Sequence, residues 1–398
     1  MKVAFVVQRY GMDINGGAEL HCRWVAEHMS RHWDVEVLTT QAVDYITWRN
    51  AYSERHEIIN GVPVRRFPVK RPRDPQRFGA IQKFILEEEH SPQEEQKWLE
   101  EEGPLSPELI DYIRGHAGDY AYFIFFSYRY YHSYRGINAV PEKSLLVPTA
   151  EHDDIIYLRL FRDLFRKPKG IIYNSYEERS LIQKISGNHQ VPGEVVGVGT
   201  RVPPRAAVEP FRRKRRISGK YLLYLGRIDE NKGCGELFDY FLRCKEETGT
   251  DIQLVLVGRN VMKIPSHPDI IYLGFLPEED KWAALNGARV LMMPSPYESL
   301  SMVTLEAWAL RKPVLVNGRC DVLKGQCRRS GGGLFYDDYS DFKRALHLML
   351  TDERLHRSLG ERGQKYFQTH YTWAVIEKKY LTLVDHIEKT AAMTSSCA

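Results

Sequence analysis

The chain has 398 residues, with 56 Lys and Arg against 52 Asp and Glu, and 43% of its residues are hydrophobic. This length exceeds one ordinary core and predicts two domains of roughly 150–200 residues each. The hydrophobic fraction excludes a chain that is disordered along its whole length, and a net charge of +4 is too small to argue for a nucleic-acid partner. No apolar run approaches the length of about 18 residues that a membrane span needs.

The N-terminal segment 1–17 contains one Lys, a short apolar run and no small-residue cleavage site. This pattern predicts a strand and not a secretory signal. The six cysteines show no paired spacing, which is typical of reduced thiols in a cytosolic protein. We therefore expect a cytoplasmic location. Peripheral binding at the inner face of the membrane is an alternative that the sequence leaves open.

Short β-branched and aromatic runs alternate with amphipathic helical stretches along the chain. Two successive series of strands are predicted, the first at 2–8, 34–40, 62–69, 122–126, 144–150, 170–175 and 193–199, and the second at 220–226, 252–258, 270–274, 288–294, 313–317 and 333–336. Strand–helix alternation in two runs predicts an α/β fold with two doubly wound parallel sheets.

The segment between Lys70 and Gly118 departs from this alternation, because a basic stretch precedes an acidic one. Its charged residues are Lys70, Arg71, Arg73 and Arg77, followed by Glu87, Glu88, Glu89, Glu94, Glu95, Glu100, Glu101 and Glu102. Modest apolar stripes predict an insertion, at about 70–118, of helical hairpins that lie over one end of the first sheet with solvated charged faces.

The apolar pattern breaks before Tyr221, at several prolines and a basic run from Arg212 to Arg216. The run is either a solvated linker or a patch for anionic membrane lipid or an anionic acceptor, and the residues leave both open.

The break predicts a first domain at residues 1–205 and a second at 206–372. A C-terminal helix at 373–390 and a disordered tail at 391–398 complete the expected organisation.

Gly16 and Gly17 follow the first strand and open a helix. Glycines allow a ligand to approach the backbone closely, and a helix N-terminus presents unpaired N–H groups to an anion. A tight turn is the simpler interpretation. The pattern G-x-G-x-x-G is absent, which argues against a dinucleotide site.

The segment Gly226–Gly233 follows the first strand of the second series, with Arg227 and Lys232 five residues apart. This spacing puts two cations at the carboxyl edge of a sheet, where open α/β sheets bind ligands. Arg can bind a diphosphate in bidentate fashion and Lys supplies a mobile point charge.

Two carboxylates, Glu298 and Glu306, lie eight residues apart, the first in a loop and the second inside the following helix. The backbone N–H groups of Ser301, Met302 and Val303 at the start of that helix can bind phosphate oxygens. Glu306 can accept hydrogen bonds from vicinal hydroxyls such as a ribose diol.

An acidic cluster, Glu151, Asp153 and Asp154, surrounds His152 after the strand at 144–150. An isolated His is more often structural, and no metal is expected here. A second group, Tyr128–Arg135, interleaves aromatic residues with Arg. It either stacks on an acceptor sugar or lipid head group or packs beneath the insertion, and the sequence does not decide between the two.

Together these motifs resemble those of retaining glycosyltransferases of family 4, which have the GT-B architecture of two Rossmann-like domains facing a cleft. The resemblance covers most of the chain, from the Gly16-Gly17 loop to the final helix after Tyr371-Thr372-Trp373, which in the family crosses back to the first domain. It implies that Arg227 and Lys232 bind the donor diphosphate, that the Gly226 turn shapes their loop, and that Glu306 binds the ribose.

By the same resemblance, Glu298 and His152 would lie beside the donor sugar as catalytic-site residues, and Phe275 and Leu276 would flank the base. This chain has Ser299 and Ser301 where glycines are common in the family after the first Glu. That departure leaves the donor-sugar preference open.

The resemblance implies a metal-independent, cofactor-free, retaining transfer of a sugar from a nucleotide-diphosphate-sugar donor. The acceptor would be a hydroxyl of a glycan, a lipid-linked glycan or a small molecule, in polysaccharide or glycoconjugate biosynthesis. The alternatives are a non-catalytic nucleotide-sugar sensor or scaffold of the same fold and, more remotely, a GT-B phosphorylase with a pyridoxal lysine.

Overall fold

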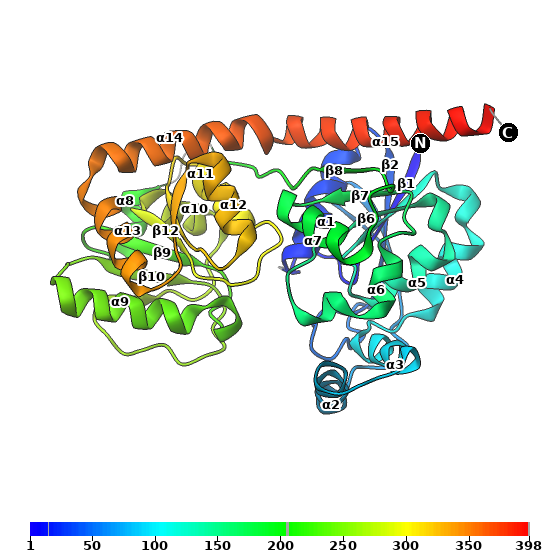
Figure 1. Cartoon of the computed structure of the whole chain (residues 1–398), viewed down its shortest axis with the longest axis horizontal. Coiled ribbons are helices and arrows are strands. Elements are labelled where there is room, and N and C mark those ends of the chain that lie inside the picture. Colours follow the sequence, from blue (N-terminus) through cyan, green and yellow to red (C-terminus); the bar gives the residue numbers. More distant parts are fainter. Residues whose placement is uncertain (15, 204–206, 397–398) are drawn as a thin grey trace. The chain divides into compact units, whose positions relative to one another are not determined.

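The computed structural model describes residues 1–14, 16–203 and 207–396, and the chain divides into two compact units (Figure 1). The first unit comprises Met1–Gly199 and Trp373–Ala398, and the second comprises Thr200–Thr372. The boundary between the two units, after Gly199, lies a few residues before the predicted boundary at 205/206. It falls close to the end of the last strand of the first sheet.

The first unit is built on an eight-stranded sheet in the order β3-β4-β2-β1-β5-β6-β7-β8. Its strands are parallel except for β3, which pairs antiparallel with β4. Their bounds are β1 (Lys2–Val6), β2 (Asp34–Thr40), β3 (His56–Ile59), β4 (Val62–Phe67), β5 (Tyr122–Phe126), β6 (Ser144–Val147), β7 (Gly170–Tyr173) and β8 (Gly193–Val195). The central strands are apolar along their length because both faces are covered by helices.

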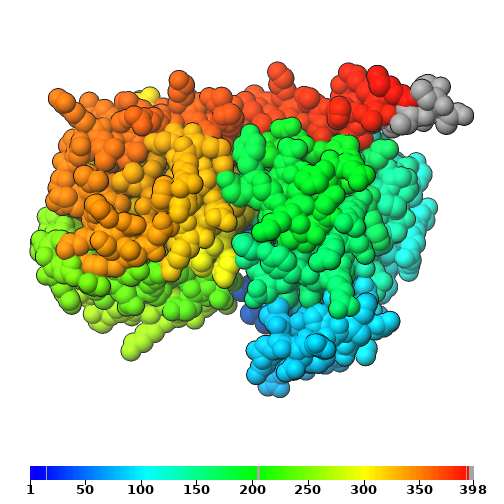
Figure 2. Space-filling view, in the orientation of Figure 1, coloured from blue at the N-terminus to red at the C-terminus, as the bar shows by residue number. Residues whose placement is uncertain are grey.

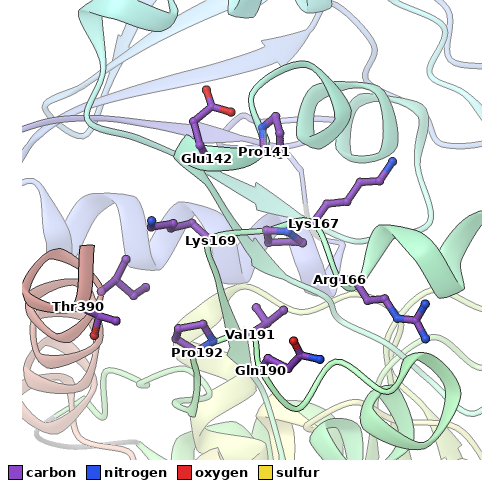
Figure 3. Close-up of a pocket in the computed structure, with 11 residues that line it drawn as sticks. Pro141, Glu142, Arg166, Lys167, Lys169, Gln190, Val191, Pro192 and Thr390 are labelled. Carbon is purple, nitrogen blue, oxygen red and sulfur yellow. The ribbon is translucent and has the colours of Figure 1, made fainter. Parts of the chain in front are cut away.

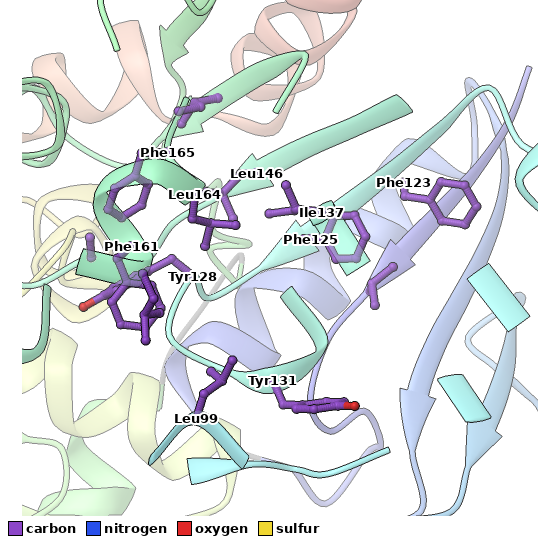
Figure 4. Packing of buried hydrophobic residues seen from close by; sticks show 14 of the residues in the cluster. Leu99, Phe123, Phe125, Tyr128, Tyr131, Ile137, Leu146, Phe161, Leu164 and Phe165 are labelled. Atoms are coloured by element: carbon purple, nitrogen blue, oxygen red, sulfur yellow. The ribbon is translucent and has the colours of Figure 1, made fainter. Parts of the chain in front are cut away.

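The helices of the first unit enclose a large aromatic core (Figure 4). Their bounds are α1 (Gly17–Met29), α2 (Pro75–Glu87), α3 (Pro92–Glu102), α4 (Pro107–Gly115), α5 (Tyr131–Ala139), α6 (Arg159–Leu164) and α7 (Tyr176–Ser186). Phe125 of β5, Leu146 of β6, Phe161 of α6 and Leu99 of α3 belong to the same buried cluster, and Figure 4 shows Phe161 beside Tyr128. The core thus joins the sheet to the acidic segment.

The insertion is helical, as predicted, but its charged face is not all solvated. Helices α2 and α3 form a lobe at one end of the first unit (Figures 1 and 2). Glu95, Glu101 and Glu102 are buried, at 1%, 4% and 3% exposure. The prediction failed for these three residues because arginines and backbone N–H groups distant in sequence bind their carboxylates.

The second unit has a six-stranded parallel sheet in the order β11-β10-β9-β12-β13-β14. Its strands are β9 (Tyr221–Leu225), β10 (Gln253–Val257), β11 (Ile270–Tyr272), β12 (Val290–Met293), β13 (Val314–Asn317) and β14 (Gly333–Tyr336). Its helices are α8 (Val208–Arg215), α9 (Cys234–Thr248), α10 (Glu278–Gly287), α11 (Met302–Ala309), α12 (Asp321–Ser330), α13 (Tyr339–Thr351) and α14 (Glu353–His370). The chain leaves β9 on one side to form β10 and β11 and then returns to form β12 on the other side.

The basic run before β9 belongs to a helix of the second unit and not to a linker. Lys214 and Arg215 of α8 both contact the carboxylate of Asp280 on α10, at 3.3 and 2.9 Å. The linker interpretation is therefore wrong for 208–215, because ion pairs to a neighbouring helix fix the run. Pro204 lies outside the described residues, and the anionic patch stays a prediction.

Helix α15 (Trp373–Ser396) belongs to the first unit. The Trp373 indole stacks on His28 of α1 at a centroid distance of 3.6 Å, and Glu377 accepts hydrogen bonds from His28 and His32 at 2.8 and 2.9 Å. The helix continues to Ser396, so residues 391–396 are helical where disorder was expected, which the helix-forming Ala and Met residues there favour. Residues 397–398 lie outside the described part.

Five cysteines of the described residues are buried free thiols, namely Cys22, Cys234, Cys244, Cys320 and Cys327. Within the same part of the chain, no helix is long and apolar enough to cross a membrane.

Candidate functional site

The strand order of the second sheet creates a switch point between β9 and β12. Because these neighbouring strands send their chains in opposite directions, the loops at their carboxyl ends diverge and leave room for a ligand. The loop after β9 carries Arg227 and Lys232, and the loop after β12 carries Glu298. The structure therefore brings these three predicted residues to one edge of one sheet.

The two loops are tied by a charge pair. Lys232 Nζ lies 3.0 Å from Glu298 Oε1 and also donates a hydrogen bond to the Tyr297 carbonyl at 3.4 Å. Gly233, with a φ of 72°, permits this close approach, because a Cβ there would lie 2.3 Å from the Pro294 carbonyl oxygen. The Lys232–Glu298 pair sets the position of both side chains.

Arg227 follows Gly226, whose N–H donates to the Val257 carbonyl of β10 at 2.9 Å. The Arg227 guanidinium lies 2.8 Å from Asp229 Oδ2, and its side chain is 37% exposed. Both predicted phosphate-binding cations are therefore paired with carboxylates of this chain. A diphosphate can bind the same two side chains through charge-assisted hydrogen bonds.

Two buried side-chain amides, neither of which was predicted as a site residue, hold the loop after β12. Asn317 Nδ2 donates to the Pro294 carbonyl at 2.9 Å, and Gln326 Nε2 donates to the Leu300 carbonyl at 2.7 Å. These bonds fix the loop at both ends. A buried Asn at the end of β13 and a Gln in α12 lack any local motif that could have indicated this role.

Ser301 precedes α11 in the left-handed region, with a φ of 65°. This conformation favours glycine, which the resembling family commonly has in this loop. The Ser301 hydroxyl bonds to the Thr304 hydroxyl at 2.9 Å and makes no side-chain cap to the helix N–H groups. The N–H groups of Met302 and Val303 are thus not capped by Ser301 and can bind an anion.

We expect Ser301→Gly to be more stable than Ser301→Ala by about 1 kcal/mol, because both variants lose the hydroxyl bond but only glycine relieves the left-handed strain. Urea unfolding of the two variants, followed by circular dichroism, measures this difference. Equal stability, or a more stable alanine variant, would show that Ser301 is not strained.

Glu306 lies inside α11 and is only 3% exposed. Its Oε1 accepts a hydrogen bond from Lys281 Nζ of α10 at 2.8 Å. Burial raises the pKa of Glu306, and the neighbouring Lys281 ammonium opposes that shift. Lys281 was not predicted from the sequence.

The turn after β11 separates the two residues expected to flank a base. Phe275 is 68% exposed, whereas Leu276 is 5% exposed and packs into the interior. The Phe275 ring is therefore available to a ligand, and Leu276 can offer only its backbone.

In the first unit, Gly16 caps α1 and Gly17 is its first residue. A Cβ on Gly16 would lie 2.1 Å from the Glu19 carboxylate, which pairs with Arg9, whereas a Cβ on Gly17 would meet open space. Local packing thus requires a glycine at position 16, whereas Gly17 leaves the N-terminus of the helix open. The geometry is compatible both with a tight turn and with an anion-binding site.

His152 lies in the segment after β6 and is exposed. Its Nε2 is hydrogen-bonded to the Tyr157 hydroxyl at 2.7 Å. The adjacent Asp153 pairs with Arg129 NH1 at 3.0 Å. Within the described residues, no group of three or more His, Cys, Asp or Glu side chains is arranged to hold a metal ion.

The structure shows where the aromatic stretch after β5 packs, for Tyr128, Arg129 and Tyr131. Tyr128 and Tyr131 are 3% and 7% exposed, and both lie in the core of the first unit, as Figure 4 shows. Arg129 pairs with Glu102 of α3. These residues pack beneath the insertion, and this packing does not support the acceptor-stacking interpretation.

A pocket of about 440 Å³ lies in the first unit (Figure 3). Its lining includes Lys169, whose N–H donates to the Ser144 carbonyl at the start of β6, and Pro192, whose carbonyl accepts from the Ile171 N–H near the start of β7. The pocket is therefore at the amino edge of the sheet, opposite the carboxyl edge that carries His152.

Residues 208–366 match the sequence model of the family described as glycosyl transferases group 1. The capsular polysaccharide biosynthesis glycosyltransferase CapM of Staphylococcus aureus is 24% identical over 183 residues, which cover 42% of this chain and 47% of CapM. The chain spans less than half of the length of the curated relatives it matches.

Solved structures are similar over nearly the whole chain. Sucrose-phosphate synthase from Thermosynechococcus elongatus has a TM-score of 0.72 at 16% identity, with 98% of this chain and 99% of that chain covered. The Anabaena HepE protein in complex with UDP-glucose has a TM-score of 0.69 at 15% identity, with 99% and 100% covered. The fold is therefore GT-B, and the family match and the curated relatives support a group 1 glycosyltransferase.

Proposed function

We propose that this chain transfers a sugar from a nucleotide-diphosphate-sugar donor to a hydroxyl acceptor, with retention at the anomeric carbon, as in glycosyltransferase family 4. The observation that carries the proposal is the placement of Arg227, Lys232 and Glu298 at the switch point of the second sheet. Two cations beside a helix N-terminus suit a diphosphate, and a buried carboxylate, Glu306, suits a diol.

In the proposed reaction the bond between the anomeric carbon and the β-phosphate oxygen breaks as the acceptor oxygen attacks from the same face. The acceptor proton passes to the leaving phosphate oxygen. Arg227, Lys232 and the first N–H groups of α11 stabilise the charge that develops on this phosphate. Glu298 and His152 orient the donor sugar while it acquires positive charge.

The names of similar proteins indicate which donors and acceptors to test first. HepE was solved with UDP and with UDP-glucose, and CapM is named for capsular polysaccharide biosynthesis. We propose a nucleotide sugar as the donor and a glycan, lipid-linked glycan or small-molecule hydroxyl as the acceptor.

A two-stage experiment tests the proposal. Thermal shifts with UDP, GDP, ADP and their nucleosides first identify the base, and mass spectrometry then follows sugar transfer from the matching nucleotide sugars to glycan and lipid extracts. Transfer of one sugar mass with release of the nucleoside diphosphate is expected. A chain that binds the donor but releases no nucleotide would be a non-catalytic sensor or scaffold.

We expect turnover to survive excess EDTA, because arginine, lysine and helix N–H groups neutralise the leaving diphosphate in the proposed site. The measurement is the initial rate before and after dialysis against EDTA. A complete loss of activity that Mg²⁺ restores would refute metal independence.

A further inference from the structure

The carboxyl edge of the first sheet contains a partly buried charge cluster that the proposed transfer does not yet use. Arg129, directly after β5, binds Glu102 through Nε and Asp153 Oδ2 through NH1, the latter at 3.0 Å. Glu102 also accepts from Arg73 NH1 at 2.9 Å. Two guanidinium groups thus pair with two carboxylates.

This cluster connects the insertion to the segment that carries His152. Glu102 is the last residue of α3, whereas Asp153 follows His152 and caps the 3₁₀ helix η3 (Asp154–Tyr157) by accepting from the Ile156 N–H at 3.3 Å. Tyr157 of η3 holds the His152 ring. Displacement of Asp153 would therefore move both the His152 backbone and its hydrogen-bond partner.

The insertion holds the far end of the same segment. Glu95 of α3 accepts hydrogen bonds from the N–H groups of Arg159 and Leu160, at 3.2 and 2.9 Å, and so caps α6. Its carboxylate is 1% exposed, so these bonds are shielded from water. The near end is held by Glu178 of α7, which accepts from the Ala150 N–H at 2.6 Å.

We propose that Arg129 is a positioning residue which, clamped between Glu102 of the insertion and Asp153, fixes the segment Thr149–Leu160 and thereby the His152 ring. The acidic insertion is then part of the machinery of transfer and not only a cover for the sheet. This inference rests on the proposed function for its effect on turnover, but the clamp itself is independent of activity.

Hydrogen exchange and kinetics test the inference together. In Arg129→Gln and in the nearly isosteric Asp153→Asn, backbone amides of the peptide 149–160 are expected to exchange at least tenfold faster, while those of β5 are unchanged. With an active donor, kcat should fall at least tenfold and the donor KM should stay within twofold, because Arg227, Lys232 and Glu306, which are proposed to bind the nucleoside diphosphate, belong to the other unit. Arg129→Lys, which keeps the charge, should restore part of kcat.

Arg55→Gln is the matched control, because Arg55 pairs with Glu108 of α4 at 2.6 Å but both side chains are about half exposed. It should leave exchange and kcat as in the wild type. Unchanged exchange in both clamp variants, or faster exchange with a normal kcat, would overturn the inference. Absence of turnover by the wild-type chain would instead refute the proposed function, and the exchange result would still decide whether the clamp exists. If Arg129→Gln does not fold, Asp153→Asn carries the test.

Discussion

Lys232→Ala and Arg227→Ala are each expected to lower kcat/KM. The expected loss of transition-state stabilisation is about 2–4 kcal/mol for each variant, comparable with the loss of one oxyanion donor. Each variant removes a cation from the diphosphate at the point where the leaving group gains charge. Loss of Lys232 also leaves Glu298 without its 3.0 Å partner, so a carboxylate would then face the phosphate unpaired. Both variants should weaken binding of the nucleoside diphosphate and barely change that of the nucleoside.

Steady-state kinetics and thermal shifts with both ligands measure these effects. Lys220→Ala is a suitable control, because Lys220 precedes β9 at the opposite edge of the same sheet and pairs with Glu353 at 3.4 Å. Near-normal kcat/KM in both site variants would show that the diphosphate binds elsewhere.

Glu306→Gln and Glu298→Gln should separate binding from catalysis. A diol contact by Glu306 forms about equally in the ground and transition states, so its loss should raise the donor KM with a smaller fall in kcat. Contacts of Glu298 should strengthen as the sugar becomes charged, so its loss should depress kcat more than affinity. The two carboxylates therefore have distinct kinetic signatures.

The pH dependence gives a second readout for Glu306. Because burial raises its pKa, the carboxylate should be lost at a higher pH than an exposed Glu as the solution is acidified. The donor KM should rise as the pH falls through that value in the wild type, and this component should be absent from Glu306→Gln. The opposite result would be a Glu306→Gln variant that loses turnover with an unchanged donor KM, and a Glu298→Gln variant in which only donor binding is weaker. That result would show that the roles assigned to the two carboxylates are reversed.

Much of the fold could be predicted, because the buried strands of both sheets are continuous apolar runs. The strand β3 was missed, since HEII is short, begins with two polar residues and pairs only at the sheet edge. The burial of Glu95 and Glu102 was missed for another reason. A run of acidic residues looks solvated unless its partners are known, and here they lie far along the chain, at Leu160 and Arg129.

Some contacts of the candidate site follow from the order of the strands along the chain, and others do not. Arg227, Lys232 and Glu298 follow strands directly, so chain order alone brings them to the same edge of the sheet. Lys281, by contrast, reaches Glu306 from another helix at 2.8 Å, and the sequence separation of 25 residues carries no local signal of that contact.

Release of nucleoside diphosphate from a donor sugar in the presence of acceptor, with the anomeric configuration of the product read by NMR, tests the central claim most directly. We predict catalytic release with retention in the wild type and in Lys220→Ala, and strongly reduced release in Lys232→Ala and Glu298→Gln. Stoichiometric donor binding without release, or a product of inverted configuration, would contradict a retaining glycosyltransferase.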